Sequence, residues 1–546
     1  MRQLLKDTTV RCVALTAMAL LAAAPLVLAD TELLNEVTVT SKRRAQPLIE
    51  TTGNVAVLDG SIIRSAAHQH VHELLSRTPA TWISRGSGQE SLPAVRSPVL
   101  TGAGSCGGFL ILEDSIPVRP SGFCNVNQLF ETVSEQARQV EVIRGPGNAL
   151  YGSNALHGTI NILMPETSNG NGAVEFGAND FARLRGTLSG SAGLLTLVYA
   201  DDGGFRDAAG YRQGKLHAGH SWDFADSSLR LAFSATDLDQ ETAGFIVGED
   251  SYRNPAINRS NPNPEAFRRA NSQRLYGVWT RQNVEVRPYL RRSDMRFLQH
   301  FLPGQPLEEN GHVSAGVILS TTSERDESSW QYGIDIEWAD VFLKQSQTGA
   351  TEGSAFLMET RPAGKHYDYD VTSLALSPWA QAEFRLGKRL TASLGLRAEY
   401  VNYDYTNNML TGNTRDDGSV CGFGGCLYTR PADRDDNFTN FAPKLGLRFM
   451  IAARSSLFVT ATRGFRAPQM TELYRLQSGQ TVADLDSERL DALEAGWRLR
   501  RDEMKFELAA FQMRKRGSVL RDANGFNVSG ARSRHDGIEA ALGWQP

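Results

Sequence analysis

Strict alternation of apolar and polar side chains constrains the fold of this chain more than any other feature. From Gly172 onward, segments of roughly 10 residues repeat this pattern, separated by turns or polar loops. In one segment the polar face includes Arg397 and Glu399, and the apolar face carries Leu390, Ala392, Leu394, Leu396, Ala398 and Tyr400. A period of two with one charged face is typical of a half-solvated strand. The pattern predicts a mainly β fold, a large antiparallel transmembrane β-barrel.

The connections between these segments fall into two classes. Those at 386–389, 452–455 and 501–503 are tight turns, whereas the long ones lie near 239–271, 345–369 and 405–437. Short turns at one rim and long loops at the other are typical of outer-membrane barrels. A soluble sandwich also alternates, but it does not usually combine export, so many long strands and charged residues on every inner face.

Composition excludes several other classes. After residue 29 no apolar run reaches 18 residues, so helical membrane spans are not predicted. The formal net charge of −4 gives no indication of nucleic-acid binding. Ser, His and Asp residues are scattered, without a nucleophile elbow or a paired-carboxylate setting. We therefore predict no catalytic residues, no enzyme activity and no cofactor.

The first 29 residues have the pattern of a secretory signal peptide. Arg2, Lys6 and Arg11 form a basic front, an apolar core follows at 12–28, and cleavage is expected before Asp30. The alternative is an N-terminal membrane anchor. The apolar core is only about 17 residues long and no stop-transfer flank follows it, so export is the prediction.

Cysteine usage agrees with export. The four cysteines beyond the signal are Cys106, Cys124, Cys421 and Cys426. An even number in an exported chain suggests disulfides, and among the possible connectivities the local pairs are the economical choice. A zinc site is the rival interpretation, but neither pair has His or Cys at finger-like spacing.

Residues 139–164 read QVEVIRGPGNALYGSNALHGTINILM and predict two strands separated by a compact loop. The first strand ends at a Gly-Pro-Gly turn, because proline lacks an amide donor and glycine tolerates positive φ. A short piece at 148–151 follows, and a β-branched run at 159–163 completes the stretch. From physics alone, this is a small α+β module or an ordinary hairpin-like connection.

The motif VEVIRGPGNALYG, followed by GTINI, closely resembles the plug signature of TonB-dependent outer-membrane transporters. The matching residues are Arg144, Gly145, Pro146, Tyr151, Gly152 and Gly158. Residues 463–468, RGFRAP, with 471–474, TELY, resemble a second signature of this family. The resemblance implies an α+β plug domain at 50–168 in the lumen of a β-barrel formed by 169–546.

A short β-branched segment follows the predicted cleavage site, and nothing nearby is predicted to pair with it. An unpaired strand near a terminus can add to the edge of another protein's sheet, although it could also begin the next domain. Within the linker at 30–49, the segment resembles the TonB box of the family. The resemblance implies that TonB binds Glu36, Val37, Thr38, Val39, Thr40 and Ser41.

Some plug elements can be predicted from local sequence. Residues 55–58 and 111–112 are expected strands. Asp59 or Ser61 is expected to cap a helix that continues to Leu75. The local disulfide at 106–124 would tie a glycine-rich plug loop that could face the ligand.

The chain departs from the family pattern at two turns. Ser97 follows Arg96 where the family usually has glycine. Ser115 follows Asp114 where the usual motif is Asp-Gly-x-Pro. The geometry of both turns is therefore left open by the resemblance.

Three histidines stand in the pattern HQHVH. On a helix His68 and His72 would share a face at i, i+4, a spacing that can chelate a metal, with His70 between them. Such histidines are more often solvated or hydrogen-bonded to a neighbour. We predict no metal site.

The barrel region contains about 16 candidate strands, whereas the family barrel has about 22. Only 78 residues follow the RGFRAP motif, fewer than is usual, and the chain lacks the usual terminal aromatic residue. We expect a barrel that is incomplete at its C-terminus. The rival is a complete 16-stranded porin-like barrel, whose lumen a plug of about 120 residues would crowd.

The sequence thus predicts TonB-dependent active transport of a scarce nutrient across the bacterial outer membrane. A ferric siderophore or another metal complex is the most common ligand class in the family; cobalamin, haem, copper and glycans stay open. The implied partners are the periplasmic C-terminal domain of TonB with its inner-membrane motor, outer-membrane lipid and the small-molecule ligand. The alternative is a passive porin-like or adhesin-like surface β-barrel. A signalling transporter would need an extra N-terminal domain, for which the roughly six residues before the TonB box leave no room.

Overall fold

The computed structural model describes residues 38, 39, 43 and 46–544, except 103, 126, 167–169, 192, 478 and 502. The predicted signal peptide lies outside the described residues. The unit considered below is the one that begins at Thr38. No helix in the described part of the chain is both long enough and apolar enough to cross a membrane.

One antiparallel sheet of 16 strands dominates the structure, which confirms the predicted fold class. Each strand pairs with the next in the chain, so the edge strands are β10 and β25. The strands are β10 (Asn171–Phe176), β11 (Ala182–Gly190), β12 (Gly193–Asp202), β13 (Tyr211–Asp223), β14 (Ser227–Glu241), β15 (Phe267–Arg281), β16 (Val284–Leu298), β17 (Leu307–Arg325), β18 (Ser328–Gln347), β19 (Gly364–Arg385), β20 (Leu390–Asn407), β21 (Arg434–Ala452), β22 (Ser455–Arg466), β23 (Glu488–Arg501), β24 (Met504–Arg521) and β25 (Asn527–Trp544).

The two faces of this sheet differ as the alternation predicts. On β18, Trp330 and Trp338 are more than 40% exposed on the outer face, whereas Gln331 and Ala339 are buried on the inner face. On β20, Arg397 and Glu399 are buried, and Leu396 is exposed. On both strands the apolar face therefore points outward, and the charged face points toward the N-terminal domain.

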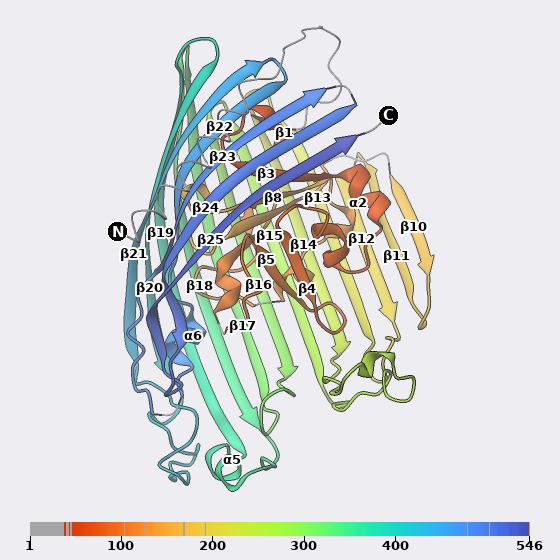
Figure 1. Ribbon diagram of the computed structural model, residues 1–546, viewed down its shortest axis with the longest axis vertical. Helices are drawn as coiled ribbons and strands as arrows, with labels where there is room; N and C mark the ends of the chain where they lie inside the picture. The colour runs from red at the N-terminus through yellow and green to blue at the C-terminus, as the bar shows by residue number, and fades with distance from the viewer. Residues whose placement is uncertain are drawn as a thin grey trace, which may run out of the picture. The chain divides into compact units, whose positions relative to one another are not determined.

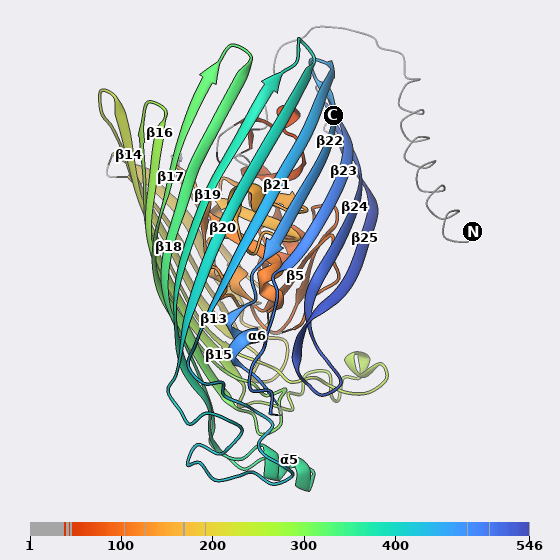
Figure 2. The same cartoon turned by 90° about the vertical axis from the view of Figure 1, so that its left-hand side faces the viewer.

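Long connections gather at one end of the sheet and short turns at the other (Figure 2). The long connections carry η5 (Ser251–Arg253), α5 (Ala355–Thr360) and α6 (Met470–Tyr474). The turn between β17 and β18, by contrast, contains only residues 326 and 327. This is the arrangement of loops and turns that the sequence predicts.

The N-terminal domain is built around a five-stranded sheet in the order β3-β8-β9-β6-β7. Its elements are β3 (Asn54–Asp59), α2 (Gly60–Ala66), α3 (Val71–Leu75), β4 (Thr81–Arg85), β5 (Ser91–Val95), η2 (Ser105–Gly108), β6 (Phe109–Glu113), β7 (Ile116–Pro117), η3 (Gln128–Glu131), η4 (Ser134–Gln136), β8 (Gln139–Arg144), α4 (Asn148–Tyr151) and β9 (Gly158–Leu163). Its apolar core includes Leu74, Ile83 and Val142. In Figure 1 this domain lies between β13–β17 and β22–β25. Ion pairs to both sides support that placement, since Glu135 pairs with Lys215 of β13 and Arg96 with Glu494 of β23.

The local strand predictions for this domain are confirmed, and the helix prediction is only partly right. The Asp59 carboxylate caps α2 by accepting hydrogen bonds from the amides of Ser61 and Ile62. The predicted continuous helix to Leu75 is wrong. Ala67 adopts the left-handed conformation, which ends α2, and α3 begins only at Val71.

The turn at Asp114 and Ser115 accommodates the missing glycine. Both residues have positive φ, 47° and 68°. The Ser115 amide donates to the Asn161 side chain at 3.0 Å, and the Asn161 amide group donates back to the Ser115 hydroxyl at 3.2 Å. These two bonds hold a conformation that glycine would adopt without strain.

Candidate functional site

The N-terminal segment of the structure pairs with its own chain. Strand β1 (Thr38–Val39) is antiparallel to β2 (Gln46–Pro47), and η1 (Leu48–Glu50) follows. The expectation that nothing nearby pairs with this segment is therefore wrong for its described part. The other TonB-box residues, Glu36, Val37, Thr40 and Ser41, lie outside the described residues.

Arg43, just after this strand, binds the inner wall of the barrel. Its guanidinium donates two hydrogen bonds of 2.7 Å to the carboxylate of Asp335 on β18. Its Cζ lies 5.0 Å from the ring centroid of Trp379 and 5.5 Å from that of Tyr151. Asp335 also accepts from Arg397 at 2.8 Å and from the Trp379 indole at 3.1 Å. The segment that follows the TonB box is thus held by a buried, bidentate ion pair.

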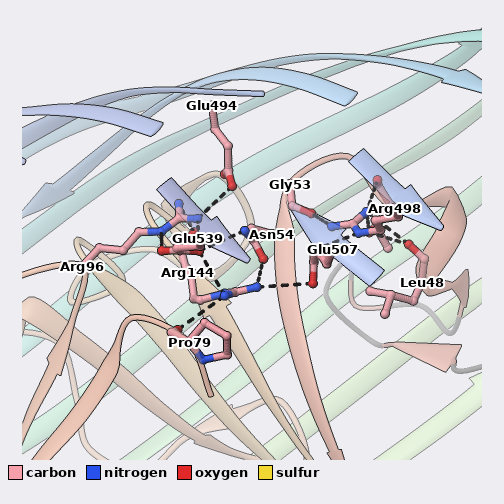
Figure 3. Close-up of polar contacts among 11 residues, drawn as sticks. Leu48, Gly53, Asn54, Pro79, Arg96, Arg144, Glu494, Arg498, Glu507 and Glu539 are labelled. Carbon is pink, nitrogen blue, oxygen red and sulfur yellow. Dashed lines mark hydrogen bonds and ion pairs between the residues drawn. The ribbon is translucent and has the colours of Figure 1, made fainter. Parts of the chain in front are cut away.

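Arg498 of β23 binds the next part of the N-terminal segment (Figure 3). Its guanidinium donates to the carbonyl oxygen of Leu48 at 3.3 Å, to that of Thr51 at 2.9 Å and to that of Gly53. It also donates to Glu507 of β24 at 3.1 Å. One barrel side chain therefore binds three backbone carbonyls immediately before β3.

Two arginines of the N-terminal domain meet barrel glutamates beside this segment (Figure 3). Arg96 donates to Glu539 at 2.6 and 2.8 Å and to Glu494 at 2.8 Å. Arg144 lies 3.0 Å from Glu539 and 3.4 Å from Glu507. Together with Arg498, three arginines face three glutamates in a site with little exposure, so the buried charge is balanced.

The pKa of Arg96 reflects this balance. Burial disfavours its charged form, but Glu494 and Glu539 outweigh that penalty and raise the pKa of the guanidinium above its ordinary value. Removing either partner would leave a buried charge uncompensated, which is more costly than losing an exposed ion pair.

The plug-signature residues build the loop that supports this interface. The Gly145 amide donates to the carbonyl of His157 at 2.9 Å, which closes the loop after β8. Gly152 has a φ of +80°, and a Cβ there would lie within 2.7 Å of side-chain atoms of Glu399 and Arg397. Only glycine therefore allows this close approach to β20. A Cβ on Gly158 would likewise meet Val95, and Pro146 lies in the turn between Gly145 and α4.

A continuous set of polar contacts leads from Arg43 toward the long-loop end. The Arg397 guanidinium donates both to the Asp335 carboxylate and to the Leu150 carbonyl. Arg397 also pairs with Glu399, which accepts a hydrogen bond of 2.5 Å from the Ser153 hydroxyl.

Beyond Ser153, the Gln469 side chain donates to Asn154 at 3.1 Å. Gln469 is the N-cap of α6 and lies between the two parts of the second family signature. Arg466, in that signature, binds Glu472, Glu488 and the carbonyl of Gly104. The two signatures thus meet at the boundary between the domains.

Both disulfides of the local pairing are present. Cys106, in η2, joins Cys124, with Cα atoms 5.7 Å apart. Cys421 joins Cys426 within the connection between β20 and β21. The first bridge ties the plug loop, and the second ties a long loop.

The three histidines do not form a shared helical face. His68 and His70 precede α3; the His68 ring contacts the Ser134 hydroxyl at 3.0 Å, and the His70 ring accepts from the His72 amide at 3.1 Å. Burial lowers the pKa of both His68 and His70 to about 4, so both are neutral at pH 7. Among the described residues, no group of three or more His, Cys, Asp or Glu could hold a metal ion.

Sequence reasoning singled out the loop residues but missed most of the charged partners. It placed Arg397 and Glu399 only on the polar face of a strand, and it treated Arg96 only as a turn residue. The available signal was an arginine or a carboxylate at an inward position of a strand, which indicates a buried partner without identifying it.

The family models match nearly the whole described chain. Residues 47–159 match the TonB-dependent receptor plug domain, and residues 164–545 match the TonB-dependent receptor-like β-barrel. The chain therefore belongs to the family of TonB-dependent receptors, which are outer-membrane β-barrel proteins.

Individual relatives are distant. The vitamin B12 transporter of Vibrio vulnificus is 27% identical over 54% of this chain and 51% of its own length. The ferric aerobactin receptor of Klebsiella pneumoniae is 22% identical over 74% of this chain and 63% of its own. The chain thus spans between about half and two-thirds of the length of these curated relatives.

Solved structures share the fold at low identity. The unliganded ferric citrate transporter FecA superposes with a TM-score of 0.71 at 13% identity, covering 91% of this chain and 75% of that one. The copper transporter OprC gives a TM-score of 0.68 at 14% identity, covering 91% and 78%.

Proposed function

We propose that the protein actively imports a scarce nutrient, a ferric siderophore or another metal complex, across the outer membrane with energy supplied through TonB. The observation that carries this proposal is the attachment of the N-terminal segment by Arg43 and Arg498. The segment that TonB would engage is joined directly to the residues that fasten the plug to the barrel wall.

The proposed mechanism begins at residues 36–41. TonB adds its sheet edge to this strand from the periplasm, which separates β1 from β2. Pulling then acts on the Arg43–Asp335 pair and next on the carbonyl groups that Arg498 binds. Since these contacts are buried, their loss weakens the attachment of the plug and allows the ligand to pass.

The long-loop end offers a cationic position for an anionic chelate. Arg361, which follows α5, has no side-chain hydrogen bond or ion pair among the described residues. Burial lowers the pKa of its guanidinium, and the charges of Arg475 and Arg521 add to this effect. A bound carboxylate or catecholate oxygen would supply the missing negative charge.

The names of two of the similar proteins support a ferric chelate as the ligand. Their names describe receptors for ferric aerobactin and ferric citrate, and others are named for copper and vitamin B12.

Uptake of radiolabelled iron tests the proposal. Cells that express the full chain should accumulate iron from ferric citrate or ferric aerobactin, and deletion of TonB should abolish that accumulation. Equal uptake in cells with and without TonB would overturn active transport.

The alternative function is a passive porin-like or adhesin-like barrel. A liposome swelling assay separates it from a transporter, because a lumen filled by a plug should not leak small sugars. Swelling at a rate comparable to that of a porin of similar size would favour the alternative.

A further inference from the structure

One buried histidine of the plug has no hydrogen-bond partner for its ring. His157 directly precedes β9 in the plug-signature loop and is only 1% exposed. Its two ring nitrogens are both buried without a partner among the described residues. Burial lowers the pKa of this imidazole well below its ordinary value, so the ring is neutral at pH 7 and one nitrogen carries a free lone pair. Such a group is costly in a protein interior unless it binds something.

A second histidine faces His157 from the barrel wall. The ring centroids of His157 and of His535, on β25, are 5.3 Å apart. Two imidazoles that bind one ion through bonds of about 2.0 Å, at an angle of about 110°, have centroids roughly 5 Å apart. The observed separation therefore matches that of a histidine pair with a shared ion.

The Ser533 hydroxyl orients the ring of His535. It lies 3.0 Å from Nε2 of His535 on the same strand. When the Nε2–H group donates to this hydroxyl, the lone pair of the imidazole is on Nδ1. Metal-binding histidines usually hold their second nitrogen in this way, which fixes both the tautomer and the orientation of the ring.

A methionine thioether supplies the third donor. Met513 of β24 lies directly opposite His535 in the register of β24 and β25, so both side chains are on the same face of the sheet. Met513 is fully buried and packs in one cluster with Leu156, the residue before His157. The surroundings of the two histidines therefore meet at Met513.

The rest of the environment is apolar or balanced in charge. The ring of Phe109 lies 6.0 Å from that of His157, centroid to centroid. Lys515 is the cation that acts most strongly on His157, and it pairs with Glu488 at 2.9 Å. Glu488 also accepts from Arg466, so its carboxylate is already shared by two cations. The donor set is thus two imidazoles and one thioether, without the oxygen ligands that Ca²⁺ and Mg²⁺ require.

We propose that His157, His535 and Met513 bind a soft monovalent metal ion, Cu⁺. Thioether sulfur is a ligand that selects Cu⁺, and imidazole suits copper as well. The bound ion joins the plug loop to β24 and β25. It adds an attachment between the two domains that is separate from those of Arg43 and Arg498 and does not rest on the proposed transport function.

Titration of the full chain, purified in detergent, with Ag⁺ tests this assignment, because Ag⁺ is a redox-stable ion with the charge and ligand preference of Cu⁺. Met513→Leu removes the sulfur at nearly constant volume and should raise the Kd of the tightest site by about tenfold or more. Ser533→Ala should raise it by about tenfold, through loss of the hydrogen bond that orients His535. Met295→Leu is the matched control, because Met295 is also a buried methionine of the barrel.

X-ray absorption of the Cu⁺ complex identifies the ligands directly. The wild type and Met295→Leu should show both nitrogen and sulfur bound to the ion, and Met513→Leu should show nitrogen alone. Sulfur that persists in Met513→Leu would overturn the assignment, as would tight binding of Ag⁺ by His157→Gln. Displacement of Ag⁺ by an equal concentration of Zn²⁺ would overturn the preference for a soft ion.

Thermal melts separate the loss of a ligand from the loss of the fold. Ag⁺ should raise the Tm of the wild type and of Met295→Leu, since an ion that binds only the folded state stabilises it. It should leave the Tm of Met513→Leu nearly unchanged. Each protein is compared with itself with and without Ag⁺, so a change in the basal stability of a variant does not imitate this result. An equal rise of Tm in Met513→Leu would contradict the proposal.

Discussion

Asp335 fastens the N-terminal segment to the barrel, and its replacement by asparagine gives the sharpest test of that role. The carboxylate is shared by Arg43 and Arg397, both at less than 3 Å and both buried. Asp335→Asn leaves the buried Arg43 without its counter-charge and leaves Arg397 with only Glu399, 3.6 Å away, a change that costs about 3–5 kcal/mol. Arg43→Gln leaves Asp335 with Arg397 and Trp379, so only a charged hydrogen-bond contribution of about 1.5–3 kcal/mol is lost.

Hydrogen exchange measures this difference directly. The amides of Val39, Arg43 and the non-proline residues of 46–53 exchange when the segment leaves the barrel wall, so their protection reports the free energy of local opening. At about 1.4 kcal/mol per tenfold, opening should become roughly 100- to 4,000-fold more frequent in Asp335→Asn and roughly 10- to 100-fold more frequent in Arg43→Gln. Amides of the core strands β8 and β9 should be much less affected.

The control is an ion pair that is not buried. Arg463 donates to Asp491 at 2.6 Å, but both side chains are more than a third exposed. Such pairs contribute about 0–1 kcal/mol, so Arg463→Gln should leave exchange at 38–53 unchanged. If Asp335→Asn accelerated exchange no more than Arg463→Gln does, the reasoning from burial and charge balance would be wrong.

Three further predictions concern other parts of the structure. Burial lowers the pKa of His68 from 6.5 in the unfolded chain to about 4 in the folded protein. The neutral, buried ring therefore contributes about 3 kcal/mol to the free energy of unfolding above pH 6.5, and this contribution is lost as the pH falls toward 4. After correction for the intrinsic pH dependence of amide exchange, the protection factors of α2 and α3 amides should therefore fall between pH 7 and 5, less steeply in His68→Gln; equal slopes would count against burial as the cause. Arg498→Lys keeps a charge for Glu507 but cannot reach all three carbonyls, and should speed exchange at 48–53 by about tenfold; an unchanged rate would refute the role of those bonds. Arg361→Gln should weaken binding of ferric citrate or ferric aerobactin by about tenfold, whereas Arg415→Gln, in the neighbouring loop, should not; equal effects would exclude a specific contact.

The strands and their faces could be predicted because both depend on local sequence. The alternation around Leu396 and Arg397 predicts which side chain faces outward, and this prediction does not depend on which strands lie on either side. The disulfides were predictable for a related reason, since short separations along the chain favour local pairing. The helix over 60–75 failed because Ala67 gave no local signal of its left-handed conformation, which ends α2 and places the His68 ring against Ser134.

The partners of the charged residues could not be predicted from sequence. Arg43 and Asp335 are 292 residues apart, and Arg96 and Glu539 are 443 apart. Which inward carboxylate meets which plug arginine depends on the register of every strand between them and on the orientation of the plug. A pattern within one strand carries no information about either quantity.

The sequence alone determined the strand-rich fold, the outward and inward faces, the plug loop and the local disulfides, because each follows from the order of neighbouring residues. Tertiary structure alone decided that Arg43 and Arg498 fasten the N-terminal segment and that three arginines balance three glutamates at the plug boundary. These contacts arise from the stagger of strands that are distant in sequence. Burial then strengthens the electrostatic interactions between their charges.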